Sequence, residues 1–393
     1  MNMPIFTGDA SDIEPLHNLC RLLLDNGAWL HRELVIHAEG GDLSLRGARP
    51  DTERASYMRV PVQLMPALQD FTLLTDRDRQ LCAVPVRKDI DPLQQRVMQL
   101  MLELYNRTGK LAQWEASYPG FAWYDQDALM QHLSSARPTN GCKQIYAAAQ
   151  NPQSIEATLP HSFMGSRKFF MRSQYSGRTS HTHVLMPLVD CLNHHPLAEG
   201  YKIHETPQPA VMRVLTRPQG EQSELFVSYN QFDAVDTLLN YGFVDSQTPF
   251  FFSVPCSVQI GQHCLEVQQQ RYLESAHRHP RLRALGRQAP GVEVTGAQSL
   301  SISGLIIPDA ENIDQLRLAA AAIGEISGLV KSHKDMEIFV RGFEAKVIEY
   351  NSQWWQTLRE LTGHLDTQHP AAQLAARGCA HLEAYAAAIA RLH

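Results

Sequence analysis

An apolar stretch that ends in amide and imidazole side chains constrains the fold of this chain more than any other feature. Residues 185–195 have the sequence L-M-P-L-V-D-C-L-N-H-H. The apolar part contains one carboxylate, Asp190, and is followed directly by Asn193 and His194. Because buried polar groups need hydrogen-bond partners, we expect either the fold itself or a ligand to satisfy these two side chains.

A second informative stretch is residues 224–244, with the sequence E-L-F-V-S-Y-N-Q-F-D-A-V-D-T-L-L-N-Y-G-F-V. Residues 225–229 alternate weakly and are rich in strand-forming types, which predicts a strand. Residues 233–240 predict a short helix, and a Y-G-F tripeptide follows it. Taken alone, Tyr229 and Tyr241 are interpreted as half-buried aromatic residues of a strand and of a helix end.

Together, the two stretches resemble the signature motifs of the SET-domain methyltransferases. The first is similar to their D-x-x-N-H segment, and the second is similar to their E-L-x-x-x-Y segment. The Y-G-F that follows resembles the subclass related to Rubisco large-subunit lysine methyltransferase. This resemblance implies an α+β fold, in which the small sheets and knot-like crossing of a SET domain are joined to a helical insertion and a C-terminal helical domain.

Composition excludes several other classes of protein. The chain has 393 residues, of which 44% are hydrophobic and 19% are charged, so it can build the cores of more than one domain. Its formal net charge of −6 argues against a general nucleic-acid-binding protein. No apolar run reaches the length of about 18 residues that a membrane helix needs, and no secretory signal is evident, so we expect no membrane partner.

The seven cysteines are scattered and form no C-x-x-C pair, which predicts free thiols in a reducing cytoplasm. Their scatter argues against the cysteine-rich zinc clusters that flank many histone-directed SET domains. Histidines at positions 181, 183, 194 and 195 form two close pairs. No cysteine or carboxylate completes a tetrahedral set with them at a recognisable spacing, so we expect no metal site.

The order of helical and strand-like segments predicts four parts. They are an N-terminal helix with the first half of the SET domain (1–75), a helical insertion (76–165), the second half of the SET domain (166–255) and a helical substrate-binding domain (256–393). In the last part, residues 265–277, 311–331 and 335–361 are predicted as helices. The apolar stripes of the two longer helices are interpreted as core.

Residues 41–47, G-D-L-S-L-R-G, resemble the glycine-rich first motif of SET domains, which contacts the methyl donor. The resemblance implies that Leu43 contacts the cofactor. Asp42 and Ser44 occupy the positions of the two family glycines, where glycine allows close backbone approach or a positive φ. A surface β-turn is the alternative interpretation of this segment.

Residues 166–169, S-R-K-F, resemble the family's S-R-x-F element. The resemblance implies that Arg167 binds the carboxylate of S-adenosyl-L-methionine (AdoMet), and a guanidinium suits this because it makes paired, charge-assisted hydrogen bonds. A solvated basic patch is the alternative. The resemblance also implies that Phe169 lines a lysine channel and, with the small Val189, favours lysine over histidine as the substrate side chain.

The resemblance further implies how the remaining residues divide their roles. Asn193 and His194 would hold the adenosyl and amino-acid parts of AdoMet, partly through the main chain, and Asp190 would brace the crossing and contact the cofactor. Tyr229 would contact the cofactor and orient the reacting groups. The Y-G-F residues Tyr241 and Phe243 would bind the substrate, with Tyr241 flanking Tyr229 and limiting the number of methyl groups.

The expected chemistry is a direct displacement at carbon. The attacking amine must be neutral, whereas a free lysine has a pKa of about 10.4, so a dry channel beside a sulfonium must favour loss of its proton. Positioning and desolvation then supply most of the catalytic effect, and no strong general base is needed.

The resemblance therefore implies an AdoMet-dependent protein-lysine N-methyltransferase that acts on a protein substrate, and we expect a cytoplasmic monomer. One alternative is a protein-histidine N-methyltransferase of the same fold. Another is a non-catalytic SET scaffold that binds a protein partner, which the altered residues 41–45 favour.

Overall fold

The computed structural model describes residues 3–47, 56–123, 125–175, 178–198, 202–204, 211–215, 224–269 and 279–391. Helices and several small sheets make up the fold, so the predicted α+β class is confirmed. The chain divides into two compact units, one formed by Met1–Ala122 with Ala147–Gln231 and the other by Trp123–Tyr146 with Phe232–His393. The predicted division into four parts stays a prediction.

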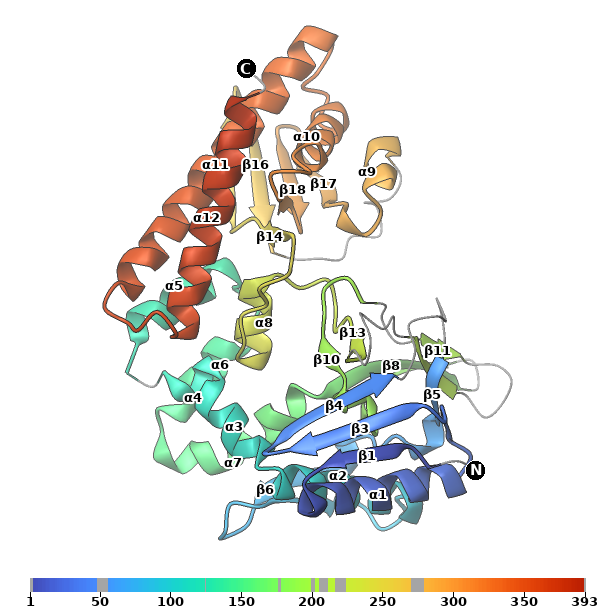
Figure 1. The fold of residues 1–393 in the computed structure, drawn as a ribbon. Coiled ribbons are helices and arrows are strands. Elements are labelled where there is room, and N and C mark those ends of the chain that lie inside the picture. Colours follow the sequence, from blue (N-terminus) through green and yellow to red (C-terminus); the bar gives the residue numbers. More distant parts are fainter. Residues whose placement is uncertain are drawn as a thin grey trace. The chain divides into compact units, whose positions relative to one another are not determined.

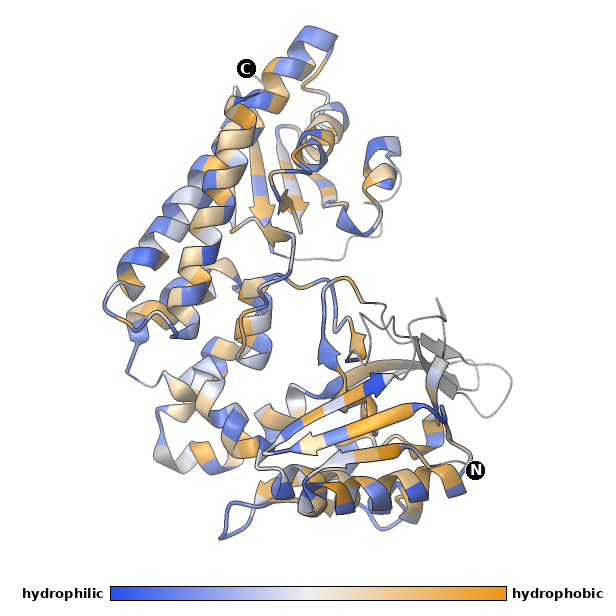
Figure 2. Cartoon of the chain, viewed as in Figure 1, coloured by the Kyte–Doolittle hydropathy of each residue, from blue (hydrophilic) through white to orange (hydrophobic). Residues whose placement is uncertain are grey.

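The first unit contains a sheet of order β1-β3-β4, in which β1 is parallel to β3 and β3 is antiparallel to β4. These strands are β1 (Ile5–Gly8), β3 (Leu34–Glu39) and β4 (Asp42–Gly47). The predicted N-terminal helix, α1 (Ala10–Asp25), packs on this sheet (Figure 1). Its apolar residues recur at helical spacing and are buried, which gives the alternating colours along α1 in Figure 2.

A second sheet in this unit joins segments that are far apart in the sequence. Its order is β11-β12-β5-β2, and β5 pairs antiparallel with both β12 and β2. Its strands are β2 (Trp29–Leu30), β5 (Ser56–Pro61), β11 (Lys202–His204) and β12 (Val211–Leu215). Because β5 and β12 lie in one sheet, the helices between them in the sequence interrupt a single folded unit.

Three two-stranded sheets complete the strands of the first unit. They are β6 (Phe71–Thr75) with β7 (Leu81–Pro85), β8 (Lys168–Tyr175) with β9 (Arg178–Leu185), and β10 (Asn193–His194) with β13 (Phe226–Val227). Short 3-10 turns connect some of the strands, namely η1 (Val62–Leu64), η2 (Leu68–Asp70) and η3 (Val189–Cys191).

Six helices lie between β7 and β8 in the described part of the sequence. They are α2 (Pro92–Arg107), α3 (Lys110–Ser117), α4 (Pro119–Ala122), α5 (Asp127–Ala136), α6 (Cys142–Ala149) and α7 (Pro152–Gly165). Helix α2 begins with a capping aspartate: the Asp91 carboxylate accepts the Leu93 N–H at 2.8 Å, and Pro92 needs no partner at the first helical position.

The second unit combines strands and helices. Its sheet has the order β15-β16-β18-β17, and β14 pairs separately with β19. The strands are β14 (Phe250–Phe252), β15 (Cys256–Ile260), β16 (His263–Gln268), β17 (Gly291–Gly296), β18 (Ser299–Ser303) and β19 (Ile306–Pro308). The helix predicted over residues 265–277 is wrong at its start, where β16 pairs with β15 and β18; residues 270–278 lie outside the described part.

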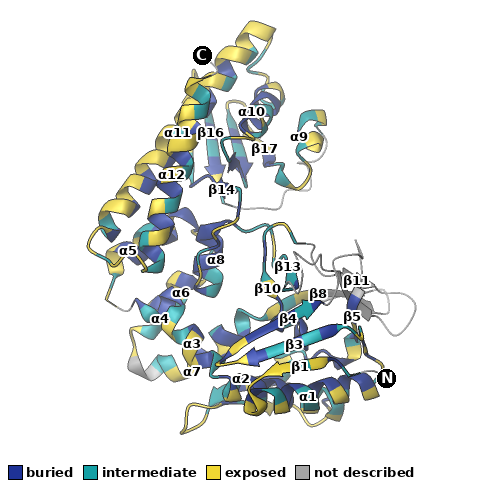
Figure 3. Cartoon of the chain, in the orientation of Figure 1, coloured by how far each residue is buried: buried dark blue, intermediate teal, exposed yellow. Residues whose placement is uncertain are grey.

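Besides α5 and the start of α6, the second unit contains the helices α8 (Ala234–Tyr241), α9 (Pro280–Leu285), α10 (Asp314–Ile326), α11 (His333–Thr362) and α12 (Pro370–Ala390). The two longest, α11 and α12, pack on each other, and Figure 3 shows their exposed faces turned outward. Gly378 permits close packing, because a Cβ there would lie 2.2 Å from the Trp355 ring. Among the described residues, no helix has the length and apolar character needed to cross a bilayer.

Candidate functional site

The two motifs of the sequence lie side by side in the first unit. Asn193 and His194 form β10, which pairs in parallel with β13, so Asn193 lies opposite Phe226 and His194 opposite Val227. The pairing brings the end of the apolar stretch against the strand that leads to Tyr229. The D-x-x-N-H and E-L-x-x-x-Y segments therefore form one local structure.

Tyr229 is bonded to the Asn-His segment at two points. Its hydroxyl donates to the Leu192 carbonyl at 2.9 Å, and its main-chain N–H donates to His194 Nδ1 at 3.1 Å. The centroids of the Tyr229 and His194 rings are 5.2 Å apart. Because Nδ1 accepts, a neutral His194 carries its ring proton on Nε2. The phenol of Tyr229 is thus held in place while its oxygen keeps lone pairs that can accept a hydrogen bond.

Asn193 is exposed, and its amide Nδ2 donates to Glu224 Oε1 at 2.5 Å. Burial raises the pKa of Glu224, and the charge of Asp42 acts in the same direction. The next residue, Leu225, donates its main-chain N–H to the Leu45 carbonyl at 2.6 Å. The first two residues of the E-L-x-x-x-Y segment therefore link the Asn-His segment to strand β4, and sequence patterns did not single out this role.

Asp190 lies half-buried in η3 and accepts a hydrogen bond from the hydroxyl of Tyr105, which is in the last part of α2. Burial raises the pKa of Asp190, although the Tyr105 bond and the Arg167 charge act against it. Burial and the Asp190 charge raise the pKa of Tyr105 well above its ordinary value. The helical insertion thus supplies the partner of the predicted aspartate, 85 residues away in the sequence.

Arg167 is half-buried against aromatic rings. Its guanidinium carbon lies 3.8 Å from the centroid of Phe163 and 5.4 Å from that of Tyr105, distances typical of cation–π contacts. Nη1 donates to Ser166 Oγ at 3.0 Å and to the Phe163 carbonyl at 3.4 Å. Among the described residues, no carboxylate forms an ion pair with this guanidinium.

Lys110 is a further cation near Arg167, and no motif indicated it. Burial lowers the pKa of Lys110 and the charge of Arg167 lowers it further, whereas Asp42, Cys191 and Asp190 act in the opposite direction. The charges of Arg167, Asp42 and Asp190 therefore all act on the ammonium group of Lys110.

Leu43 is a buried residue of strand β4, only 5% exposed. The turn that precedes it consists of Gly40 and Gly41, whose φ angles of 56° and 84° are left-handed, as a two-residue hairpin requires. A Cβ on Gly41 would lie 2.5 Å from the Thr108 carbonyl oxygen, so this position needs glycine. The hairpin pairs Asp42 with Glu39, and the cofactor contact of Leu43 stays a prediction.

Phe169 is half-buried in β8 and lies opposite Val184 of β9. Its neighbour Phe170 is 53% exposed, so the two side chains differ in environment as strand alternation requires. Val189 is fully buried in η3. Whether Phe169 lines a substrate channel stays a prediction.

Tyr241 and Phe243 belong to the second unit. Tyr241 is the last residue of α8, and Gly242 ends the helix with a left-handed φ of 84°. The Tyr241 ring centroid is 5.9 Å from that of Phe232 and 6.1 Å from that of Phe243. These three rings form an aromatic group, and the substrate roles of Tyr241 and Phe243 stay predictions.

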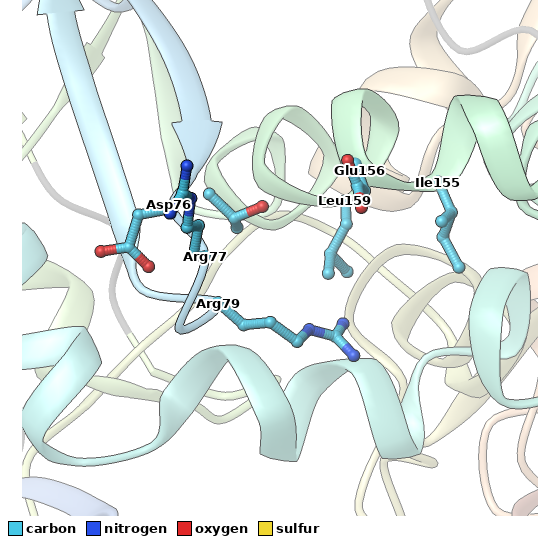
Figure 4. Close-up of a pocket in the computed structure, with 7 residues that line it drawn as sticks. Asp76, Arg77, Arg79, Ile155, Glu156 and Leu159 are labelled. Atoms are coloured by element: carbon cyan, nitrogen blue, oxygen red, sulfur yellow. The ribbon is translucent and has the colours of Figure 1, made fainter.

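A pocket of about 550 Å³ also lies in the first unit, away from the predicted residues. It is lined by Thr75, Asp76, Arg77, Arg79, Ile155, Glu156 and Leu159. Figure 4 shows Arg79 extending from the β6–β7 turn toward the residues of α7. Arg79 is already paired with Glu115 at 2.7 Å, and none of the lining residues belongs to a motif.

No group of three or more metal-binding side chains occurs in the part of the chain that the structure describes. The side chain of His181 lies outside that part, so the first histidine pair is only half described. His195 uses Nδ1 to accept the Leu197 N–H at 3.1 Å and packs on Phe226.

Three solved structures are similar to this chain. The SET domain of LSMT bound to lysine and AdoHcy covers 94% of this chain and 88% of its own, with 12% identity and a TM-score of 0.40. The same SET domain bound to MeLysine and AdoHcy covers 98% and 93%, with 12% identity and a TM-score of 0.38. Rubisco LSMT bound to AdoMet covers 96% and 92%, with 12% identity and a TM-score of 0.37.

No protein-family model matches the chain, and no curated protein matches it. At this identity and these TM-scores, the function of the chain has to be inferred from its own side chains.

Proposed function

We propose that this chain is an AdoMet-dependent protein-lysine N-methyltransferase. The observation that carries the proposal is the joining of the two motifs in the first unit. Strand β10 pairs with β13, and Tyr229 bonds to Leu192 and His194. A phenol held beside an Asn-His segment suits a reaction in which small groups must be oriented rather than chemically activated.

The side chains fit the polar ends of AdoMet. Arg167 offers a half-buried guanidinium that no described carboxylate neutralises, which suits the carboxylate of an amino-acid group. Asn193 is exposed and lies in the strand beside Tyr229, where its main-chain and amide groups could contact the cofactor. When bound, AdoMet supplies a methyl group on a sulfonium.

Residues of this chain orient the reacting groups and exclude water. The Leu192 carbonyl fixes the Tyr229 hydroxyl, so its oxygen can accept a hydrogen bond from a neutral amine or a polarised methyl group without reorganisation. The half-buried ring of Phe169 would exclude water from the amine. Exclusion of water favours the neutral form of lysine, because a dry environment disfavours its charge.

A non-catalytic scaffold is the second candidate, and one observation favours it. Residues 42–47 form a regular strand in which Leu43 is buried, and Asp42 and Ser44 stand at the positions of the two family glycines. A protein-histidine methyltransferase would use the same site, and Phe169 favours lysine against it.

We further propose a protein substrate, a monomer and a reducing, cytoplasmic location. All seven cysteines are free, and four of them are buried. Free thiols persist where the environment is reducing.

Calorimetry with AdoMet and S-adenosylhomocysteine tests the proposal. We expect saturable binding of both ligands. If neither ligand binds at high protein concentration, the non-catalytic scaffold is the candidate function that remains. Incubation of the protein with a lysate and isotope-labelled AdoMet, followed by mass spectrometry, then identifies the modified residue. Label on lysine supports the proposal, whereas label on histidine would replace it with the histidine activity.

A further inference from the structure

We propose that Lys110, from the helical insertion, acts with Arg167 to bind the carboxylate of the methyl donor's amino-acid end. This inference rests on the proposed function and adds a residue that none of the motifs contains.

The fold places Lys110 at the corner between α2 and α3. Lys110 is the first residue of α3, directly after Gly109, whose φ of 63° turns the chain between the two helices. Within the same corner, Tyr105 bonds to Asp190, and its ring lies 5.4 Å from the Arg167 guanidinium. The corner therefore faces both the aspartate and the arginine of the candidate site.

The other side of the corner is held by the hairpin that precedes Leu43. Gln113 Nε2 donates to the Gly40 carbonyl at 3.2 Å, and Gly41 packs closely against the Thr108 carbonyl. These contacts fix Lys110 between the β3–β4 turn and η3. The backbone at Lys110 is thus held by contacts of the neighbouring residues Thr108 and Gln113.

The two cations at this corner are partly removed from water. Lys110 and Arg167 are both half-buried, and neither forms an ion pair with a carboxylate among the described residues. Burial lowers the pKa of Lys110 and the charge of Arg167 lowers it further, while Asp42, Cys191 and Asp190 act in the opposite direction. An anion bound between the two cations would relieve both their repulsion and their incomplete solvation.

A carboxylate suits this pair of cations. A guanidinium can bind both oxygens of a planar carboxylate, and an ammonium adds a point charge from a second direction. Arg167 has donors to spare, because its bonds to described residues involve only Nη1. Burial raises the pKa of Asp190, so its carboxyl group is less readily ionised and competes less for the two cations than an ordinary carboxylate would.

The test compares two ligands that differ in one group, S-adenosylhomocysteine and its decarboxylated analogue. Their affinities are measured by calorimetry for the native chain, Lys110→Met, Lys110→Arg and the control Lys143→Met. Lys143 is an exposed residue of α6. For Lys110→Met we expect about tenfold weaker binding of S-adenosylhomocysteine, the size of one charge-assisted hydrogen bond, and less than about twofold change for the analogue.

Lys110→Arg should recover most of the affinity, and Lys143→Met should match the native chain. Equal weakening of both ligands, or no weakening of either, would overturn the role of Lys110 while leaving the proposed function intact. If the native chain binds neither ligand, the proposed function itself falls. Should Lys110→Met not fold, Lys110→Gln is measured in its place, with the same expectation for the two ligands.

Discussion

The main-chain N–H of Tyr229 donates to Nδ1 of His194 at 3.1 Å, so the two motifs of this chain are tied together by a side chain of one and the backbone of the other. A second bond, from the Tyr229 hydroxyl to the Leu192 carbonyl, fixes the phenol itself. Local backbone pairing alone would leave the phenol free to rotate. The two bonds together give the hydroxyl a defined direction.

Replacing Tyr229 with phenylalanine removes that directed hydroxyl. We expect methyl transfer to be lost while AdoMet affinity stays within about tenfold, because the hydroxyl acts mainly at the transition state. Single-turnover transfer and calorimetry measure the two effects separately. Tyr350→Phe is a matched control, since Tyr350 is 40% exposed on α11. Full transfer activity in Tyr229→Phe would remove Tyr229 from the mechanism.

Replacing Arg167 with alanine removes both a cation and a stacked side chain. We expect AdoMet binding to weaken by more than about 1 kcal/mol, the order of one charge-assisted hydrogen bond. Loss of the contact with Phe163 should also lower the free energy of unfolding by about 0.5–1 kcal/mol. Arg341→Ala, at an ion pair in which both side chains are 55% exposed, should change neither quantity measurably. Unchanged AdoMet affinity in Arg167→Ala would make Arg167 a purely structural residue.

Asp190 should make the stability of the protein depend on pH. Its folded-state pKa is raised above the ordinary value of 3.8, so its contribution to stability is complete below that value and is lost as pH rises through the folded pKa. Asp190→Asn keeps an oxygen that can accept from Tyr105 and removes the charge. Its melting temperature should therefore equal the native one near about pH 4 and exceed it near about pH 8.

Thermal unfolding across this pH range measures the difference, with Asp89→Asn as the control, since that side chain is 76% exposed. A lower melting temperature for Asp190→Asn at alkaline pH would mean that the ionised carboxylate stabilises the fold.

A buried ionic cluster stabilises the second unit. The Arg137 side chain is 1% exposed; it donates from Nε to Asp236 Oδ1 at 2.9 Å and from Nη2 to Asp233. Arg137→Met would leave two buried carboxylates without their cation, so we expect a loss of about 3–5 kcal/mol in the free energy of unfolding. Urea denaturation measures it, and Arg341→Met should change it by less than about 0.5 kcal/mol. A loss below about 1 kcal/mol for Arg137→Met would show that water or rearrangement compensates the carboxylates.

Much of the secondary structure could be predicted from local patterns. The apolar spacing of α1 and the Asp91-Pro92 start of α2 each depend on residues within a few turns. The prediction of a helix at the start of residues 265–277 was wrong because β16 pairs with a strand on each side, β15 and β18. Pairing with distant strands overrides a weak local preference.

The sequence alone determined which residue types were available for a site, since Asn193, His194, Tyr229 and Arg167 stand in recognisable motifs. Only the tertiary structure decided which residues these side chains contact. Tyr105 reaches Asp190 across 85 residues of sequence, and the ring of the same tyrosine packs against Arg167. Short-range periodicity records which face of a helix or strand is buried, but contacts between distant segments depend on how whole elements pack, and that is why these partners could not be predicted from the sequence.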